Sequence, residues 1–125
     1  MDTSTKALNY FGELLITKVR DETITDWHMI INGEMKDPES KKIFNDLSIF
    51  NNEQKEYIKY LINKVVDTSL HHMLWTFEQN ETVDISINID NTYIKSIRNI
   101  SDGLSGELYS EDGWIAKFSS QFYEL

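Results

Sequence analysis

Apolar residues recur at spacings of three and four along residues 51–79, the period of an α-helix that buries one broad face. Asn51 and Gln54 have the form of a capping box at its start, and no glycine or proline interrupts the stretch before Asn80. The pattern predicts one continuous long helix on which the rest of the chain packs. Its apolar positions are Ile58, Leu61, Ile62, Val65, Val66, Leu70, Met73, Leu74 and Phe77.

A helix is also predicted over the first 20 residues. Thr3 and Ser4 are suitable N-cap residues, and the apolar stripe extends to about Arg20. Gly12 lies beside that stripe, where a missing side chain can let a neighbouring backbone approach closely. The stripe consists of Leu8, Phe11, Leu15 and Val19.

Two further short helices are predicted before the long one. The polar residues 21–23 indicate a break, after which a threonine caps a second helix that stops at Asn32 and Gly33. Asp37, Pro38 and Glu39 then supply an N-cap, a proline at the first helical position and an acid in the first turn, so a third helix should begin there.

The pattern changes to a period of two over residues 83–89, where isoleucine and valine alternate with polar residues. This alternation predicts a β-strand with one buried face. Asp90 and Asn91 are typical of a turn. Residues 93–100 fit either a strand or a helix, and we favour the strand because a hairpin is the shortest way to pair the first one.

Three of the five glycines lie in the last quarter of the chain, which indicates turns. Trp114, Ile115, Phe118 and Phe122 nevertheless have helical spacing, and they predict a closing segment that docks on the core. We therefore expect a mainly helical α+β fold: four helices organised around a long central one at 51–79, a small β element at 83–89 that forms a hairpin with 93–100, and a C-terminal closing segment.

Length and composition favour a single folded domain over residues 1–125. The chain has no cysteine, which excludes disulfides, thiolate metal sites and cysteine nucleophiles. No secretory signal and no membrane-spanning apolar run is visible, so we expect a cytoplasmic protein that does not enter the membrane.

Charge is the strongest compositional feature, because the chain has 12 lysines and arginines but 21 aspartates and glutamates, for a net charge of −9. A surface of this sign repels phosphate backbones, so nucleic acid is not an expected partner. It can instead steer association with a basic protein, although acidity also simply keeps small proteins soluble.

The long helix carries adjacent histidines, His71 and His72. At about 100° per residue a regular helix directs them to different sides, so the pair cannot chelate one ion. His71 shares the outer face with Asp67 and Glu78, which together could provide part of a divalent metal site. A solvated ion pair is the simpler interpretation, and no cofactor is expected.

His72 instead falls at the edge of the apolar stripe beside Ser69 and Thr76. Polar side chains in such a position either satisfy one another and the neighbouring backbone or line a pocket. A Ser–His–acid triad is rejected, because neither an orienting acid nor an oxyanion hole is identifiable. No catalytic residue is predicted, so we expect a protein without enzymatic activity.

The C-terminal quarter combines acids with aromatic residues, the composition of a surface that binds a basic protein. The candidate partner-binding residues are Glu107, Tyr109, Glu111, Asp112 and Trp114. The leading hypothesis is a small acidic protein-binding or regulatory domain, of which an immunity-type inhibitor of a basic toxin is one version. The alternative is a small-molecule or divalent-metal-binding protein that uses the histidine-bearing helix. The sequence leaves the oligomeric state open.

Overall fold

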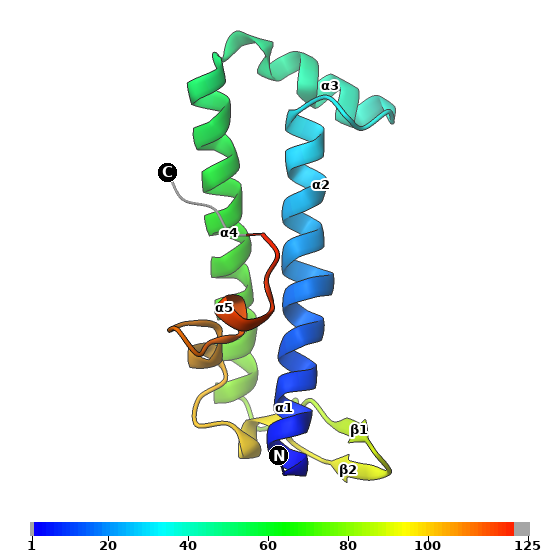
Figure 1. Ribbon diagram of the computed structural model, residues 1–125, viewed down its shortest axis with the longest axis vertical. Coiled ribbons are helices and arrows are strands. Elements are labelled where there is room, and N and C mark those ends of the chain that lie inside the picture. The colour runs from blue at the N-terminus through cyan, green and yellow to red at the C-terminus, as the bar shows by residue number, and fades with distance from the viewer. Residues whose placement is uncertain (1, 122–125) are drawn as a thin grey trace.

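A computed structural model describes residues 2–121, and two long antiparallel helices form its body (Figure 1). The first long helix, residues 3–31, comprises α1 (Thr3–Leu14), a π-helical segment (Leu15–Arg20) and α2 (Asp21–Ile31). The second is α4 (Asn52–Gln79). The mainly helical α+β class and the long helix at 51–79 are thus confirmed.

The break predicted at residues 21–23 is wrong, because the first long helix continues through them. The Asp21 amide donates to the Ile16 carbonyl, five residues earlier, which is the wider turn of a π-helix. The Asp21 side chain does not cap a new helix; it is buried and accepts hydrogen bonds from Arg20 and Ser119. Its polarity therefore reflects a tertiary contact that no local pattern reveals.

The third predicted helix is confirmed as α3 (Pro38–Asp46), which lies across one end of the two long helices (Figure 1). Asp37 accepts a hydrogen bond from the Ser40 amide at 3.1 Å, and Pro38 occupies the first turn. A short 3₁₀ segment (Leu47–Ile49) then leads to α4.

The predicted capping box is also present at the start of α4. Asn51 Oδ1 accepts from the Gln54 amide at 2.8 Å, and Gln54 Oε1 accepts from the Asn51 amide at 2.9 Å. We expect Asn51→Ala to lower the free energy of unfolding by about 1 kcal/mol, because the Gln54 amide loses its acceptor, Asn51 Oδ1. Urea denaturation followed by circular dichroism measures this, with exposed Asn52→Ala as the control. Equal losses in the two variants would contradict the role of the cap.

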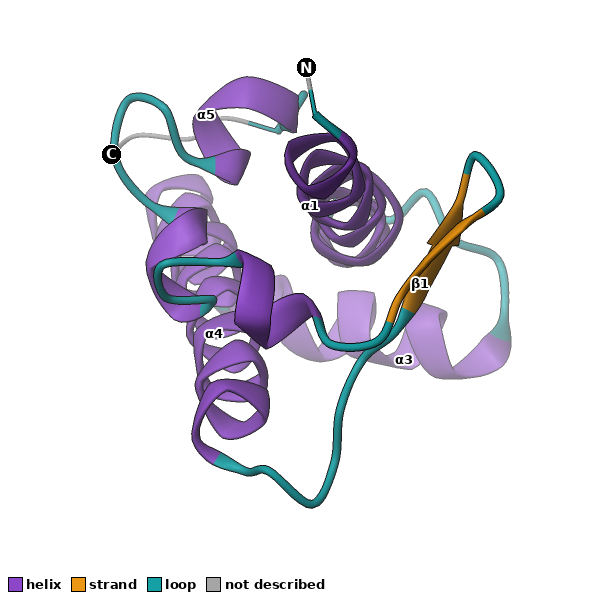
Figure 2. Ribbon diagram, turned by 90° about the horizontal axis from the view of Figure 1, so that it is seen from below, coloured by secondary structure: helices purple, strands orange, loops and turns teal. Residues whose placement is uncertain are grey.

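The β element is shorter than predicted. Strands β1 (Ile87–Ile89) and β2 (Thr92–Ile94) pair antiparallel, with Ile87 opposite Ile94, and the turn residues Asp90 and Asn91 both have positive φ. The hairpin lies beside α1, on the side away from α5 (Figure 2). Lys6 of α1 forms an ion pair with Asp90 of the turn.

Residues 83–86 do not join the strand as predicted. The Asp84 carboxylate accepts from the Ile85 amide and from Ser96 Oγ, and these local bonds compete with a strand ladder. They and a longer contact with Arg98 hold the pKa of Asp84 below its usual value. Residues 93–100 are partly strand and partly helix, since β2 ends at Ile94 and a 3₁₀ segment (Ile97–Ile100) follows.

A third 3₁₀ segment (Ser105–Leu108) and α5 (Trp114–Phe118) cover the lower half of the two long helices in Figure 1. The predicted closing segment is therefore present at Trp114, whereas Phe122 lies outside the described residues. The buried core sits under this cover. It consists of Leu15, Ile16, Leu70, Leu74, Ile97, Leu104, Leu108 and Trp114.

Gly12 lies against an aromatic ring rather than against a neighbouring backbone. A Cβ atom at Gly12 would come within 2.4 Å of the Trp114 ring, which itself packs edge-on against Phe11 at a centroid distance of 5.8 Å. The absence of a side chain at Gly12 thus makes the space that Trp114 fills.

Candidate functional site

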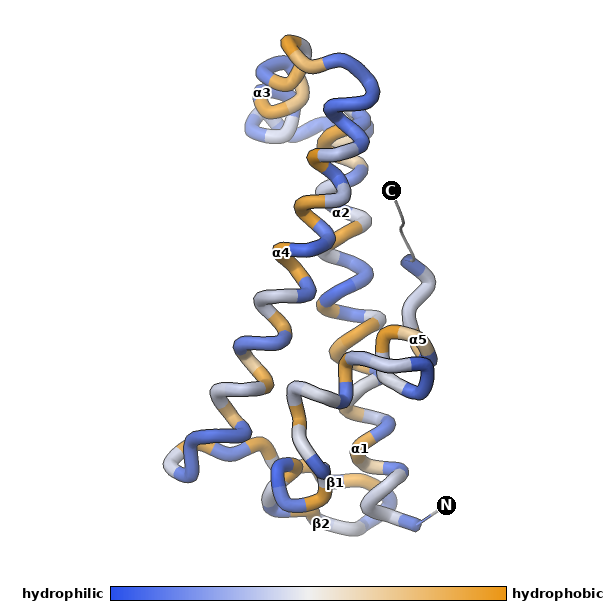
Figure 3. Tube along the Cα trace, turned by 90° about the vertical axis from the view of Figure 1, so that its left-hand side faces the viewer, coloured by the Kyte–Doolittle hydropathy of each residue, from blue (hydrophilic) through white to orange (hydrophobic). Residues whose placement is uncertain are grey.

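The broad apolar face of α4 is only partly buried, contrary to the sequence prediction. Leu70 and Leu74 lie in the core, whereas Leu61 is 45% exposed and Val65 is 64% exposed. Hydrophobic positions recur along the whole helix in Figure 3, but the C-terminal segments cover only part of it. The apolar stripe is therefore wider than the surface that the fold buries.

The uncovered part of this face forms one wall of a groove with a volume of about 520 Å³. The first long helix contributes Val19, Thr23 and Trp27, and α4 contributes residues from Ile58 to Leu70. Trp27 is 38% exposed, so this aromatic side chain is accessible from solvent. A shallower hollow adjoins the groove around Lys64, Thr68 and His72. The structure thus presents a continuous apolar surface along the two long helices.

Beyond Lys64, the surface of α4 beside the groove exposes no charged side chain. Within residues 65–79, all of which the structure describes, no exposed side chain is an aspartate, glutamate, lysine or arginine. We call the exposed residues Val65, Thr68, Ser69, His72, Trp75 and Thr76 the uncharged strip. The two acids of this stretch, Asp67 and Glu78, are partly buried and engaged elsewhere, by Arg20 and by the Ser105 amide respectively.

The hydroxyl groups of the uncharged strip are satisfied within α4 itself. Thr68 donates to the Lys64 carbonyl at 2.8 Å, Ser69 to the Val65 carbonyl at 2.9 Å and Thr76 to the His72 carbonyl at 2.7 Å. A covering surface would therefore not leave these donors without a partner. These three hydroxyl groups can therefore be covered at little cost.

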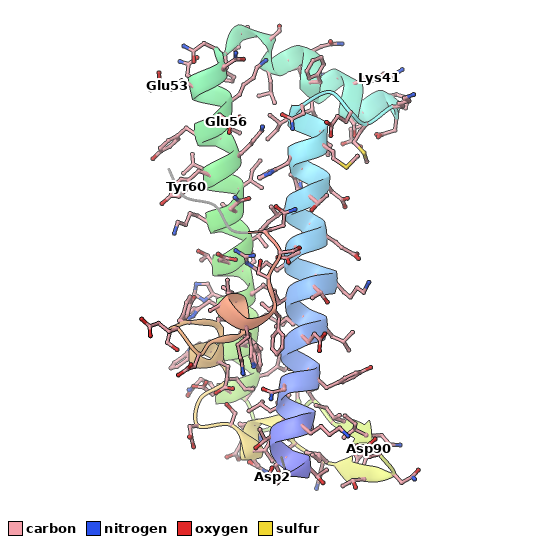
Figure 4. The ribbon with its side chains drawn as sticks, viewed as in Figure 1. Asp2, Lys41, Glu53, Glu56, Tyr60 and Asp90 are labelled. Carbon is pink, nitrogen blue, oxygen red and sulfur yellow. The ribbon has the colours of Figure 1, made fainter. Side chains whose placement is uncertain are left out.

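Exposed charged side chains occur at both ends of the molecule and also along the long helices, as at Lys18 and Glu22. In Figure 4, Lys41, Glu53 and Glu56 lie at the α3 end, and Asp2 and Asp90 lie at the hairpin end. Residues 65–79, the second half of α4, thus expose no charged side chain in a chain of net charge −9.

The predicted pocket residues Ser69, His72 and Thr76 are exposed rather than buried. They do not form a hydrogen-bonded cluster, because the two hydroxyl groups bond to backbone carbonyls. Ser69 lines the groove and His72 lines the adjoining hollow. The set thus marks one edge of the apolar surface.

The predicted metal residues Asp67, His71 and Glu78 are not brought together. Asp67 pairs with Arg20, Glu78 accepts from the Ser105 amide, and His71 lies 5.9 Å from the Tyr109 ring centroid. The structure, over the residues that it describes, contains no cluster of three or more histidines and acids that could hold a metal ion.

The rings of His71 and His72 lie edge to face at a centroid distance of 5.4 Å. His71 also lies beside Tyr109, whereas exposed His72 lines the hollow on α4. His28, the remaining histidine, contacts Asn63 of α4 at 3.0 Å.

The predicted partner-binding residues are divided between the surface and the core. Glu111 and Asp112 are exposed, and Tyr109 is 46% exposed. Glu107 is half-buried, and its burial raises the pKa of its carboxyl against the opposing effect of Lys117. Trp114 is 1% exposed, so it anchors the core and cannot contact a partner.

Sequence reasoning missed a buried polar cluster at the π-helical segment. Arg20, 2% exposed, donates from Nε to Asp67 at 2.6 Å and from Nη1 to Asp21 at 2.9 Å. Asp21 also accepts from Ser119 Oγ and from the Ser120 amide, both at 2.8 Å. The cluster fastens the C-terminal segment to both long helices. Adjacent arginine and aspartate residues are common on exposed helices, so the sequence contains no signal of their burial.

Sequence reasoning also missed the groove between the two long helices. A signal for it lies on α4, in the consecutive apolar pairs Leu61–Ile62 and Val65–Val66. Such pairs make the apolar stripe wider than one neighbouring helix can cover.

No helix in the described part of the chain is long and apolar enough to cross a membrane. Comparisons with protein-family models, with curated proteins and with solved structures found no match to this chain.

Proposed function

We propose that this chain is a protein-binding domain without catalytic activity, and that it binds through the groove and the uncharged strip. The observation that carries the proposal is the exposed, uncharged surface on α4, where Val65 is 64% and Trp75 is 47% exposed. Interface centres are depleted in charged residues and enriched in aromatic ones. The elongated groove between two helices suits the side-chain ridge of another helix.

Photocrosslinking in the native cell tests this proposal. We expect p-benzoylphenylalanine at Thr68 to give one discrete crosslinked protein band, because Thr68 lies in the middle of the uncharged strip. The same residue at exposed Glu39 of α3 serves as the control and should give no discrete band. Absence of a band from Thr68 would overturn the proposal, whatever the identity of the partner.

An inhibitor of a basic protein is a second version of the same function. It is favoured by the exposed acids Glu111 and Asp112 beside Tyr109. Crosslinking from Tyr109 distinguishes it: a band obtained there and not from Thr68 would place the partner on the acidic C-terminal surface.

The groove volume of about 520 Å³ also falls in the range of small-molecule sites, which favours an apolar ligand as a second candidate function. Native mass spectrometry of the purified chain would then show an additional small mass that Val65→Glu removes.

A further inference from the structure

We infer that the partner at the groove is an amphipathic α-helix of another protein, with lysine or arginine residues along the edge of its apolar stripe that faces Glu22 and Asp26. The inference rests on the proposed protein-binding function and states the chemistry of the partner. It follows from the shape of the groove, from the scarcity of hydrogen-bonding groups in it and from the charges on its two sides.

The two walls of the groove are ridges of the same period. On each long helix, residues spaced by four line the groove, and such rows form the ridges between which the side chains of another helix pack. The lining part of α4, Ile58 to Leu70, is about 18 Å long at 1.5 Å per residue, which matches about three turns of a further helix. The rows are Val19, Thr23 and Trp27 on the first long helix, and Ile58, Ile62 and Val66 on α4.

The groove offers few hydrogen-bonding groups to an occupant. Among its lining residues only Thr23, Trp27 and Ser69 have polar side-chain atoms, and the Ser69 hydroxyl already donates to the Val65 carbonyl. An extended peptide would bury backbone amides and carbonyls without partners here, whereas a helix satisfies its own. The groove therefore suits a helix rather than a strand.

Acids border the groove on the first long helix. Glu22 and Asp26 are exposed and lie one turn apart, and each directly precedes a residue of the wall, Thr23 or Trp27. Ile24, which follows Thr23, is buried, so Glu22 lies on the opposite, outer side of the wall. A helix seated in the groove therefore has two carboxylates beside one of its edges.

Both acids can pair with a partner. Asp26 forms no ion pair with a described residue, and Glu22 pairs with Lys18 at 3.5 Å, where the two side chains are 61% and 67% exposed. Exposed pairs of this kind are weak, so a cation of the partner can take the place of Lys18.

The lysines of α4 do not offset these acids. All three lysines of α4, a helix described over its whole length, hold their ammonium groups against side chains that do not line the groove. The chain has a net charge of −9, so the groove favours a basic helix over an acidic one. The contacts are Lys55 with the Phe44 ring, Lys59 with the Glu56 carboxylate and Lys64 with the Tyr60 ring.

The described C-terminal segment leaves the groove open. Gln121 donates to Thr25 at 2.8 Å, and Thr25 lies about 200° around α2 from both Thr23 and Trp27. A helix can therefore contact both walls without displacing Gln121.

Two synthetic helical peptides of about 18 residues test the inference. Both carry the same leucine stripe, and one edge of that stripe carries lysines in the first peptide and glutamates in the second, at spacings of four. We expect the full chain to bind the lysine peptide about tenfold more tightly, because its ammonium groups meet Glu22 and Asp26, which oppose the carboxylates of the other peptide. Fluorescence anisotropy of the labelled peptides at physiological ionic strength measures the two affinities. Equal affinities, or no binding of the lysine peptide, overturn the inference.

Charge reversal separates the effect of the groove from that of the overall charge. Glu22→Lys combined with Asp26→Lys should make the chain prefer the glutamate peptide. The matched control combines Glu111→Lys with Asp112→Lys, which changes the net charge equally at the exposed C-terminal surface and should keep the preference for the lysine peptide. An equal loss of preference in the two double variants would show that only the net charge selects the peptide, and the inference would fail.

A bulky substitution tests where the helix binds. Ser69→Trp places an indole in the groove and should weaken binding of the lysine peptide by about tenfold or more. Thr76→Trp is the control, because Thr76 is also exposed on α4 and also donates to the carbonyl four residues earlier, but does not line the groove. Circular dichroism verifies that all variants fold. Undiminished binding by the Ser69→Trp variant contradicts the inference.

The native partner distinguishes failure of this inference from failure of the proposed function. Mass spectrometry of the protein crosslinked from Thr68 should identify an amphipathic helix with lysine or arginine along one edge. A partner without such a helix, a second copy of this chain included, overturns the inference but leaves the proposed protein-binding function intact. Absence of any crosslinked band overturns the proposed function, and the inference with it.

Discussion

Arg20→Met is expected to lower the free energy of unfolding by about 3–5 kcal/mol, the range for removal of one partner from a buried ion pair. The substitution keeps an unbranched apolar stem but removes the guanidinium group that donates to Asp21 and Asp67. Two partly or fully buried carboxylates would then lack their counter-charge. Urea denaturation followed by circular dichroism measures the loss.

Lys18→Met is the matched control, because it removes a positive charge from the same π-helical segment. Lys18 pairs with Glu22 at 3.5 Å on the surface, where the pair contributes about 0–1 kcal/mol. Adding Asp67→Asn to Arg20→Met should recover part of the stability, since one stranded carboxylate is neutralised. A loss in Arg20→Met no larger than in Lys18→Met would show that the buried cluster does not stabilise the fold.

Trp114→Ala should cost about 3–5 kcal/mol, the usual range for truncation of a buried large aromatic side chain. Trp114 is 1% exposed, contacts Phe11 and fills the space above Gly12. Its loss would leave a cavity between α5 and α1 that the surrounding helices cannot fill. Thermal and urea denaturation should both register the change.

Tyr93→Ala provides the comparison, because Tyr93 is 65% exposed in the hairpin and should change stability by less than about 0.5 kcal/mol. Comparable losses in the two variants would contradict the assignment of Trp114 to the core rather than to a binding surface.

The helices and their caps could be predicted because their signals are local. The Asn51–Gln54 capping box and the Asp37–Pro38 start each depend on residues three positions apart or closer. The predicted break at residues 21–23 is wrong for the opposite reason. Asp21 accepts hydrogen bonds from Ser119 and Ser120, almost 100 residues away. A helical period also cannot show how much of an apolar stripe the rest of the fold will cover.

The candidate site was predictable only in part. The sequence directed attention to Ser69 and His72, which do border the groove, but as buried polar residues rather than exposed ones. The metal set failed to assemble because Asp67 meets Arg20, a partner 47 residues away. The sequence assigned Trp114 both to the closing segment and to the partner-binding residues, and its 1% exposure and close approach to Gly12 assign it to the core.

The π-helical segment determines which residues in the second half of the first long helix face α4. One residue more than an α-helical turn requires is accommodated between Ile16 and Asp21. If the same residues wound as a regular α-helix with none removed, everything that follows would rotate by about 100° relative to α1. Trp114 would keep its contact with Gly12, while Arg20 and the groove wall at Thr23 and Trp27 would turn away from α4. The π-helical turn therefore determines both whether Arg20 reaches its buried partners and how the first long helix faces the groove.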